Sequence, residues 1–251
     1  MFFKKYKNSI FIILFILNFL KAYSFRLDNL SFNERIDTNE GGYREFYLTN
    51  DSLIRKRYKM NVISGSKNDG AKYVEVFPKV ITINPKSKGI VKVFVKAPKE
   101  TPKGEYDFKL QFQPINIPTL AQNTQGKIEG TSHIMVAPIL QMQAYVGEVD
   151  FTKHLKLENI KVLNNENGGI SVKSLLSNTS YASIDFGAEA YGKNNFLYES
   201  VYVADLPGNT KNLEVTLHFP KIKNTRDLRK IIFYRTPSNT RKVIKEIEIL
   251  Q

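Results

Sequence analysis

The chain has 251 residues, of which 42% are hydrophobic and 24% charged, and its formal net charge is +13. It contains no cysteine, which excludes a disulfide scaffold, thiol catalysis and cysteine–metal sites. Its three histidines, His133, His154 and His218, are far apart and lack metal-ligand spacing. The chain also lacks a phosphate-binding glycine loop and a Gly-x-Ser-x-Gly elbow. These features predict that the protein is not an enzyme and uses no cofactor or metal.

Residues 1–24 have the pattern of a cleaved signal peptide, so we expect export with Phe25 as the first mature residue. The pattern consists of the basic residues Lys4, Lys5 and Lys7, the apolar run Ile10–Leu20 and the triplet Ala22-Tyr23-Ser24. The alternative is an uncleaved membrane anchor, although the apolar run is shorter than the roughly 20 residues of a bilayer span. Cleavage removes four lysines and no acids, which lowers the net charge from +13 to +9. The basic residues are scattered and the chain is exported, so nucleic acid is not an expected partner.

Short runs rich in Val, Ile, Tyr and Phe, separated by Gly, Asn, Pro and Ser, predict antiparallel strands along most of the chain. In the first half the predicted strands are Tyr43–Asn50, Tyr58–Ile63, Tyr73–Phe77, Val80–Ile83, Ile90–Val95 and Tyr106–Phe112. In the second half they are Leu155–Leu163, Gly169–Asn178, Ala182–Tyr191, Phe196–Ala204, Asn212–Phe219, Lys230–Tyr234 and Val243–Leu250. No segment has the pattern of a long amphipathic helix. The predicted fold class is all-β, with two immunoglobulin-like antiparallel β-sandwich domains.

A faint internal repeat supports two domains. Leu48-Thr49-Asn50-Asp51-Ser52 and Leu176-Ser177-Asn178-Thr179-Ser180 each lie early in their half, before another predicted strand. We interpret Asn50 and Asn178 as turn residues whose side chains bond the local backbone. Asn178-Thr179-Ser180 also fits the glycosylation pattern, which is common by chance. The strand pattern stops at Gly147 and restarts after Asp150, so we predict domains at residues 25–148 and 149–251.

The segment Ile115–Ser132 is rich in Asn, Gln, Gly and Thr and predicts a mobile loop. Directly after it, Ile134–Leu140 has no polar side chain, and the run continues to Met142 and Tyr145. An unbroken apolar strand is either buried on both faces or has an apolar face that a partner covers. Pro138 lacks a backbone N–H and therefore favours an edge strand or a bulge. An apolar edge strand is an aggregation hazard unless something covers it.

Successive side chains of a strand point to opposite faces, so this run divides into two sets. Ile134, Val136, Leu140 and Met142 form the first set, with Pro138 between them; Met135, Ala137 and Ile139 form the second, which continues into Gln141 and Gln143. We predict that the first set faces a partner because it is larger and stays apolar further along the strand. A register shift of one residue exchanges the two sets.

The order of these strands resembles the periplasmic pilus and fimbrial assembly chaperones, the PapD-like family, of which the chain looks like a divergent member. The matching segments are Val76–Pro85, Ile90–Val95, Pro102–Leu110 and the loop opening at Ile117-Pro118. The resemblance implies a periplasmic chaperone without enzymatic activity. It also implies that the last strand of the first domain completes the unfinished fold of a pilin or fibre subunit by donor-strand complementation.

The resemblance further implies a site for the subunit's terminal carboxylate, formed in the family by an Arg on the first strand and a Lys on the last. Arg35, in Phe32-Asn33-Glu34-Arg35-Ile36, is the counterpart of that Arg, but the last strand has no Lys. The predicted client-binding residues are thus Ile134, Val136, Leu140, Met142 and Arg35. Expected partners are pilin subunits and an outer-membrane usher, with self-association through Ile134–Met142 in the free protein. The alternative function is an immunoglobulin-like structural subunit or adhesin of a surface fibre, which uses the same strand to polymerise.

Overall fold

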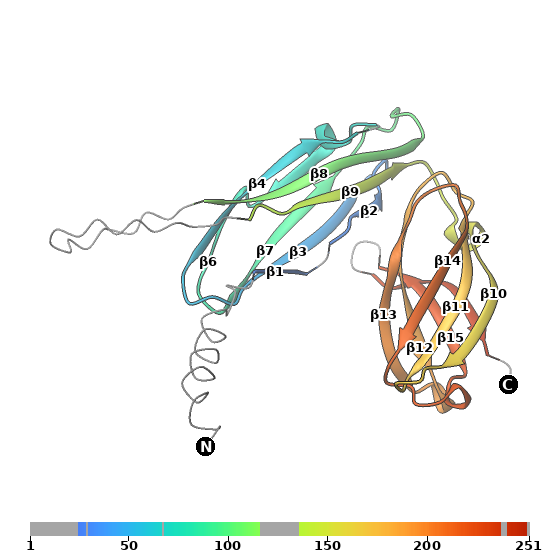
Figure 1. Cartoon of the computed structure of the whole chain (residues 1–251). Helices are drawn as coiled ribbons and strands as arrows, with labels where there is room; N and C mark the ends of the chain where they lie inside the picture. The colour runs from blue at the N-terminus through green and yellow to red at the C-terminus, as the bar shows by residue number, and fades with distance from the viewer. Residues whose placement is uncertain (1–24, 29, 67, 116–135, 237–239, 250–251) are drawn as a thin grey trace, which may run out of the picture.

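The computed structural model describes residues 25–28, 30–66, 68–115, 136–236 and 240–249. The predicted signal peptide, most of the predicted loop and Ile134 therefore lie outside the described residues. The described part forms two immunoglobulin-like β-sandwiches that meet at an angle (Figure 1), which confirms the predicted fold class. No helix in these ranges has the length and hydrophobicity needed to cross a bilayer.

The first sandwich packs a four-stranded sheet against a five-stranded sheet. The four-stranded sheet has the order β1-β3-β7-β5 and consists of β1 (Phe25–Asp28), β3 (Gly42–Asn50), β7 (Ser87–Val95) and β5 (Val74–Phe77). The five-stranded sheet has the order β2-β9-β8-β4-β6 and consists of β2 (Asn33–Arg35), β9 (Ile139–Val146), β8 (Gly104–Ile115), β4 (Lys56–Ser64) and β6 (Val80–Ile83). A 3-10 turn, η1 (Ala71–Tyr73), precedes β5.

The second sandwich packs a three-stranded sheet against a four-stranded sheet. The first has the order β10-β11-β14, with β10 (Leu155–Asn164), β11 (Ile170–Asn178) and β14 (Thr210–Phe219). The second has the order β13-β12-β15-β16, with β13 (Leu197–Leu206), β12 (Ile184–Tyr191), β15 (Lys230–Arg235) and β16 (Lys242–Glu248). Three short helical turns, α2 (Phe151–His154), η2 (Lys193–Asn195) and η3 (Thr225–Asp227), complete it.

Alternation along the strands builds a separate core in each sandwich. In β7 the side chains of Val91, Val93 and Val95 are fully buried, whereas Ile90 and Phe94, on the other face of the strand, stay more than 40% exposed. This is the period of two that a sheet with one wet face requires. At the end of the first domain Ala144 and Val146 still pack in its core, whereas Tyr145 between them and Phe151 belong to the core of the second domain. The exact division at Glu148 remains a prediction.

The repeated Asn turn is built in the same way in both domains. The amide of Asn50 donates to the carbonyls of Ile54 (2.8 Å), Ile83 (3.1 Å) and Asn84 (3.1 Å). Its Oδ1 accepts from the backbone N–H and hydroxyl of Ser52, at 3.1 and 2.6 Å. The side chain is fully buried. The interpretation of this residue as a turn anchor is confirmed, because one amide satisfies the polar groups of two crossing segments.

Asn178 repeats this arrangement in the second domain. Its amide donates to the carbonyls of Ala182 (2.8 Å), Leu206 (3.2 Å) and Pro207 (3.2 Å), and its Oδ1 accepts from the N–H and hydroxyl of Ser180. The side chain is fully buried, so it is a structural anchor and its amide has no surface for a glycan. The common geometry shows that the short sequence repeat marks equivalent places in two similar sandwiches.

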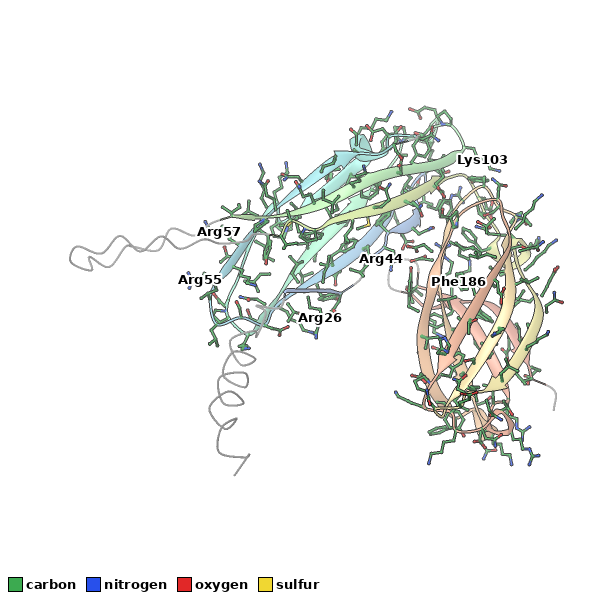
Figure 2. All side chains as sticks on the ribbon, in the orientation of Figure 1. Arg26, Arg44, Arg55, Arg57, Lys103 and Phe186 are labelled. Atoms are coloured by element: carbon green, nitrogen blue, oxygen red, sulfur yellow. The ribbon has the colours of Figure 1, made fainter. Side chains whose placement is uncertain are left out.

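A buried group of charges joins the domains. Arg44 of β3 pairs with Glu34 of β2 at 2.9 Å and, across the junction, with Asp185 of β12 at 3.4 Å. From the other side Arg235 of β15 pairs with Asp185 at 3.4 Å and donates to the side-chain oxygen of Asn33 at 3.1 Å. The four charged side chains are 5–7% exposed and balance in charge. Figure 2 shows Arg44 at the end of the first sandwich that adjoins the second.

Candidate functional site

The candidate site is β9, the strand that follows the predicted loop. It pairs antiparallel with β8 along its whole length, from Gly104↔Val146 to Gln111↔Ile139. On its other side, β2 pairs in parallel only with residues Gln143 to Tyr145. Within the described residues, the first half of β9 is therefore an open sheet edge (Figure 1).

The backbone groups at this edge follow from the hydrogen bonds of the covered half. The N–H of Gln143 donates to the carbonyl of Phe32 (3.0 Å), and the carbonyl of Tyr145 accepts from the N–H of Ile36 (2.9 Å). Odd-numbered residues of β9 therefore direct their backbone groups away from β8. By the same alternation, the N–H and carbonyl groups of Ile139 and Gln141 face the open edge.

The side chains show that the predicted partner face was wrong for Met142. Met142 is 1% exposed and belongs to the core of the first domain, and Leu140 packs against the same core. The opposite face, with Ile139 at 51% exposed, points outward. The sequence offered two apolar sets of similar character, and the register with β8 selects between them: Leu110 lies opposite Leu140, and Phe108 lies opposite Met142.

Val136 and Pro138 of the apolar run lie just before β9. Val136 is 73% exposed and lies before β9 begins. Pro138 also precedes the strand, and its carbonyl accepts a hydrogen bond from the N–H of Phe112 at 3.0 Å. By the alternation along this strand, the N–H that Pro138 lacks would also face β8, so the pair with Phe112 has one backbone hydrogen bond instead of two, at the entry to the strand.

A polar contact fixes the exposed face of β9. The amide of Gln141 donates to Oδ2 of Asp107 on β8 at 3.1 Å. The same oxygen accepts from the N–H and hydroxyl of Ser66, at 2.7 and 2.8 Å. Gln141 is thus held against its neighbour strand, which leaves Ile139 as the large apolar side chain of this face. The sequence analysis did not identify this anchor, because Asp107 and Ser66 are 41 residues apart.

Arg35 lies on β2, next to the covered half of β9. Its guanidinium makes a two-point contact with Asp37, Nε to Oδ1 at 2.9 Å and the second nitrogen to Oδ2 at 3.2 Å. The Arg35 hydrogen bond lowers the pKa of Asp37 below its ordinary value, and the same contact raises the pKa of Arg35. The predicted carboxylate anchor therefore already holds a carboxylate of its own chain. Its side chain is 36% exposed.

Within the described ranges, no group of three or more His, Asp and Glu side chains is arranged to hold a metal ion.

No family model matches this chain, and no curated protein gives a significant match. Among solved structures it is similar to the DraB chaperone of E. coli, at 10% identity over 91% of this chain and 96% of that chain, with a TM-score of 0.42. It is also similar to the CupB2 chaperone of Pseudomonas aeruginosa, at 10% identity over 89% and 100% of the two chains, with a TM-score of 0.38. A third is the CsuC–CsuE chaperone–tip adhesion subunit complex of Csu pili from Acinetobacter baumannii, at 11% identity over 77% and 89%, with a TM-score of 0.39.

The chain is similar to pilus chaperones. The likeness extends over both sandwiches.

Proposed function

We propose that this protein is a periplasmic chaperone that binds pilus or fibre subunits through the open edge of β9 and delivers them for assembly. The observation that carries the proposal is the combination of a free sheet edge at Ile139–Gln141 with exposed apolar side chains at Val136 and Ile139. Backbone hydrogen bonds at such an edge supply affinity, and alternate side chains supply specificity.

In this proposal Ile139 enters the groove of the subunit, with Val136 in contact just before the strand. Leu140 and Met142 hold β9 in the domain core and do not touch the subunit. Ile134 remains a client-binding prediction on sequence alone. We propose that Arg35 binds the terminal carboxylate of a subunit after releasing Asp37. In the free protein the carboxylate of Asp37 therefore occupies the Arg35 guanidinium.

The partners in this proposal are pilin or fibre subunits and an outer-membrane usher that receives them. In the free protein the exposed edge also favours self-association, since unpaired strand edges pair with one another. The signal peptide supplies the route to the periplasm. The alternative, a structural fibre subunit that polymerises through the same edge, predicts long polymers of the isolated protein rather than this limited pairing of edges.

The test is the capture of a refolding subunit. A fibre subunit encoded beside this gene, prepared without a completing strand, is diluted from urea into the protein, and the products are separated by size exclusion. We expect a one-to-one complex with the wild-type chain and no complex with Ile139→Glu. The matched control is Ile90→Glu, at an exposed site (42%) on the opposite sheet of the same domain. It should capture the subunit normally.

Both variants must melt close to the wild-type temperature, because both side chains are already hydrated. A folded Ile139→Glu protein that captures the subunit as well as the wild type would remove β9 from the proposed site. Purified wild-type chains that grow into long concentration-dependent polymers without any subunit would instead favour the structural-fibre function.

A further inference from the structure

The two domains begin alike and then differ in how they are closed. In the first domain β1 starts opposite the buried Asn, with Phe25 paired to Asn50; in the second, β10 starts at the same place, with Leu155 paired to Asn178. β1 ends after four residues, and the chain crosses to the other sheet as β2. β10 instead continues along β11 to the pair Asn164↔Ile170.

This crossing closes the first domain. As β2, the chain runs parallel to the last strand, β9, and its flanking residues Phe32 and Ile36 are 1% and 0% exposed in the core. Between them, Glu34 points inward and pairs with Arg44 at 2.9 Å. A short parallel strand thus fills the seam between the two sheets with three inward side chains at alternate positions.

The second domain has no such closing strand among its described residues. Its last strand, β16, pairs with β15 on one side, and no described strand pairs with its other side or with the outer side of β10. A cleft of about 600 Å³ lies between these two edges. We call it the β10–β16 cleft, and its lining consists of Ile160, Val162, Ile247 and Ile249 with Thr225, Arg226 and Glu248.

The cleft leads toward the core of the domain. Ile160 and Ile247 also line a small void beneath it, whose other walls include Val172, Leu217 and Ile231. The side chains of Ile160, Val162, Ile247 and Ile249 are only partly buried, although they pack against the core. The apolar interior of this domain is therefore reachable from one seam, the seam that β2 closes in the first domain.

We propose that the β10–β16 cleft is a second peptide-binding site, which takes an extended, uncharged segment of a partner polypeptide as a parallel strand beside β16. The position of β2 beside β9 within the same chain supplies the geometry. The cleft is separate from the open edge of β9, so the proposal of this second site does not depend on the function proposed above.

The chemistry of the cleft specifies the segment. In the first domain the middle residue of β2, Glu34, pairs with Arg44, which lies six residues before Asn50. The equivalent position of the second domain, six residues before Asn178, is Val172, which is buried and lines the void. The bound partner segment must therefore have an apolar side chain at the middle of its three inward positions. Arg226 and Glu248 at the mouth carry opposite charges, so they do not select a charged guest. The expected pattern is three apolar side chains at alternate positions.

Two other occupants fit less well. Lipid acyl chains match the apolar lining, but they offer no hydrogen bonds to the strand edges that border the cleft, and backbone groups at such edges require them. A second copy of this chain would offer its exposed run before β9. There Val136 and Ile139 are three residues apart, so in an extended chain they point to opposite faces and cannot enter one cleft together.

The probe for this site is a capped, fluorescein-labelled peptide with isoleucine at three alternate positions separated by threonine. The control peptide has serine in place of each isoleucine. Hydrogen exchange of the full mature chain with saturating peptide should show new protection in β16, Lys242–Glu248. Ile139→Glu should keep this protection, because it alters only the other edge. By fluorescence anisotropy, Val162→Glu should weaken peptide binding at least tenfold.

Leu163→Glu is the matched control, since Leu163 is the next residue of the same strand and is 44% exposed. It should bind the peptide like the wild type. Protection confined to β9, equal binding of the serine peptide, or unchanged affinity in Val162→Glu would overturn the proposal. Displacement of the peptide by laurate, with protection of the cleft by laurate alone, would assign the site to an acyl chain and also overturn it. The exchange map of the wild-type chain decides the matter even if Val162→Glu fails to fold.

Discussion

Replacing Asn178 with alanine tests whether the repeated turn anchors each sandwich separately. The wild-type side chain donates to three carbonyls at 2.8–3.2 Å and accepts from the N–H and hydroxyl of Ser180. In the variant, Ser180 can still donate its hydroxyl to Ala182, at 2.7 Å. Its backbone N–H and the carbonyls of Leu206 and Pro207 lose their bond to Asn178.

The magnitude follows from these losses. A net hydrogen bond contributes about 1 kcal/mol, and a buried group left unpaired costs about 1–3 kcal/mol. With three groups affected, we expect the free energy of unfolding of the second domain to fall by about 3–5 kcal/mol, a large part of the roughly 5–15 kcal/mol of a typical domain. Asn50→Ala should have the same effect on the first domain. Lys173→Ala, at an exposed site of the same strand as Asn178, should change stability by less than about 0.5 kcal/mol.

Hydrogen exchange with mass spectrometry is the suitable assay, because the chain has no tryptophan and each domain must be followed by its own peptides. Asn178→Ala should accelerate exchange in β11, β12 and β14 and leave β3, β7 and β8 unchanged, and Asn50→Ala should do the reverse. A loss below about 1 kcal/mol, or equal acceleration in both domains, would refute the reasoning.

Three further predictions follow from the described contacts. Met142→Glu should unfold the first domain, because it buries a charge in an apolar core, whereas Ile139→Glu should leave its melting temperature nearly unchanged; circular dichroism on both variants tests the assigned faces. Asp185→Ala should cost about 3–5 kcal/mol and loosen the domain junction, since it takes the carboxylate partner from the buried Arg235 and leaves Arg44 with Glu34 alone; small-angle scattering that shows an unchanged angle between the domains would contradict this. The hydrogen bond from Arg35 lowers the pKa of Asp37 in the folded state, so this contact adds stability above the unfolded pKa, and that stability is lost as the pH falls through the lower folded pKa. Asp37→Asn should therefore make the melting temperature fall less steeply with pH below about pH 4. An unchanged slope would show that the Arg35–Asp37 pair does not contribute to the pH dependence of stability.

Much of the fold could be predicted from alternation and turn chemistry, which act within a few residues. The strand Val80–Ile83 was predicted with its observed bounds, and the predictions around Asn50 and Asn178 gave both the strands and the role of the turn. These features are local because a strand shows its faces by a period of two and a buried amide needs partners nearby. The start of the last strand of the first domain could not be predicted from hydrophobicity, since the apolar run begins at Ile134 but β9 begins at Ile139.

The candidate site shows what the sequence by itself determined and what only the tertiary structure decided. Composition and pattern predicted an exported all-β chain with an apolar edge strand near residues 134–142. The face that this strand exposes was decided by its register with β8, which buries Met142 and leaves Ile139 outward. The crossing of β2 to β9, and the lack of such a strand beside β16 in the part of the chain that the structure describes, were decided in the same way. Alternation fixes that a strand has two faces and two edges, but strands distant in sequence fix which face is buried and which edge stays open.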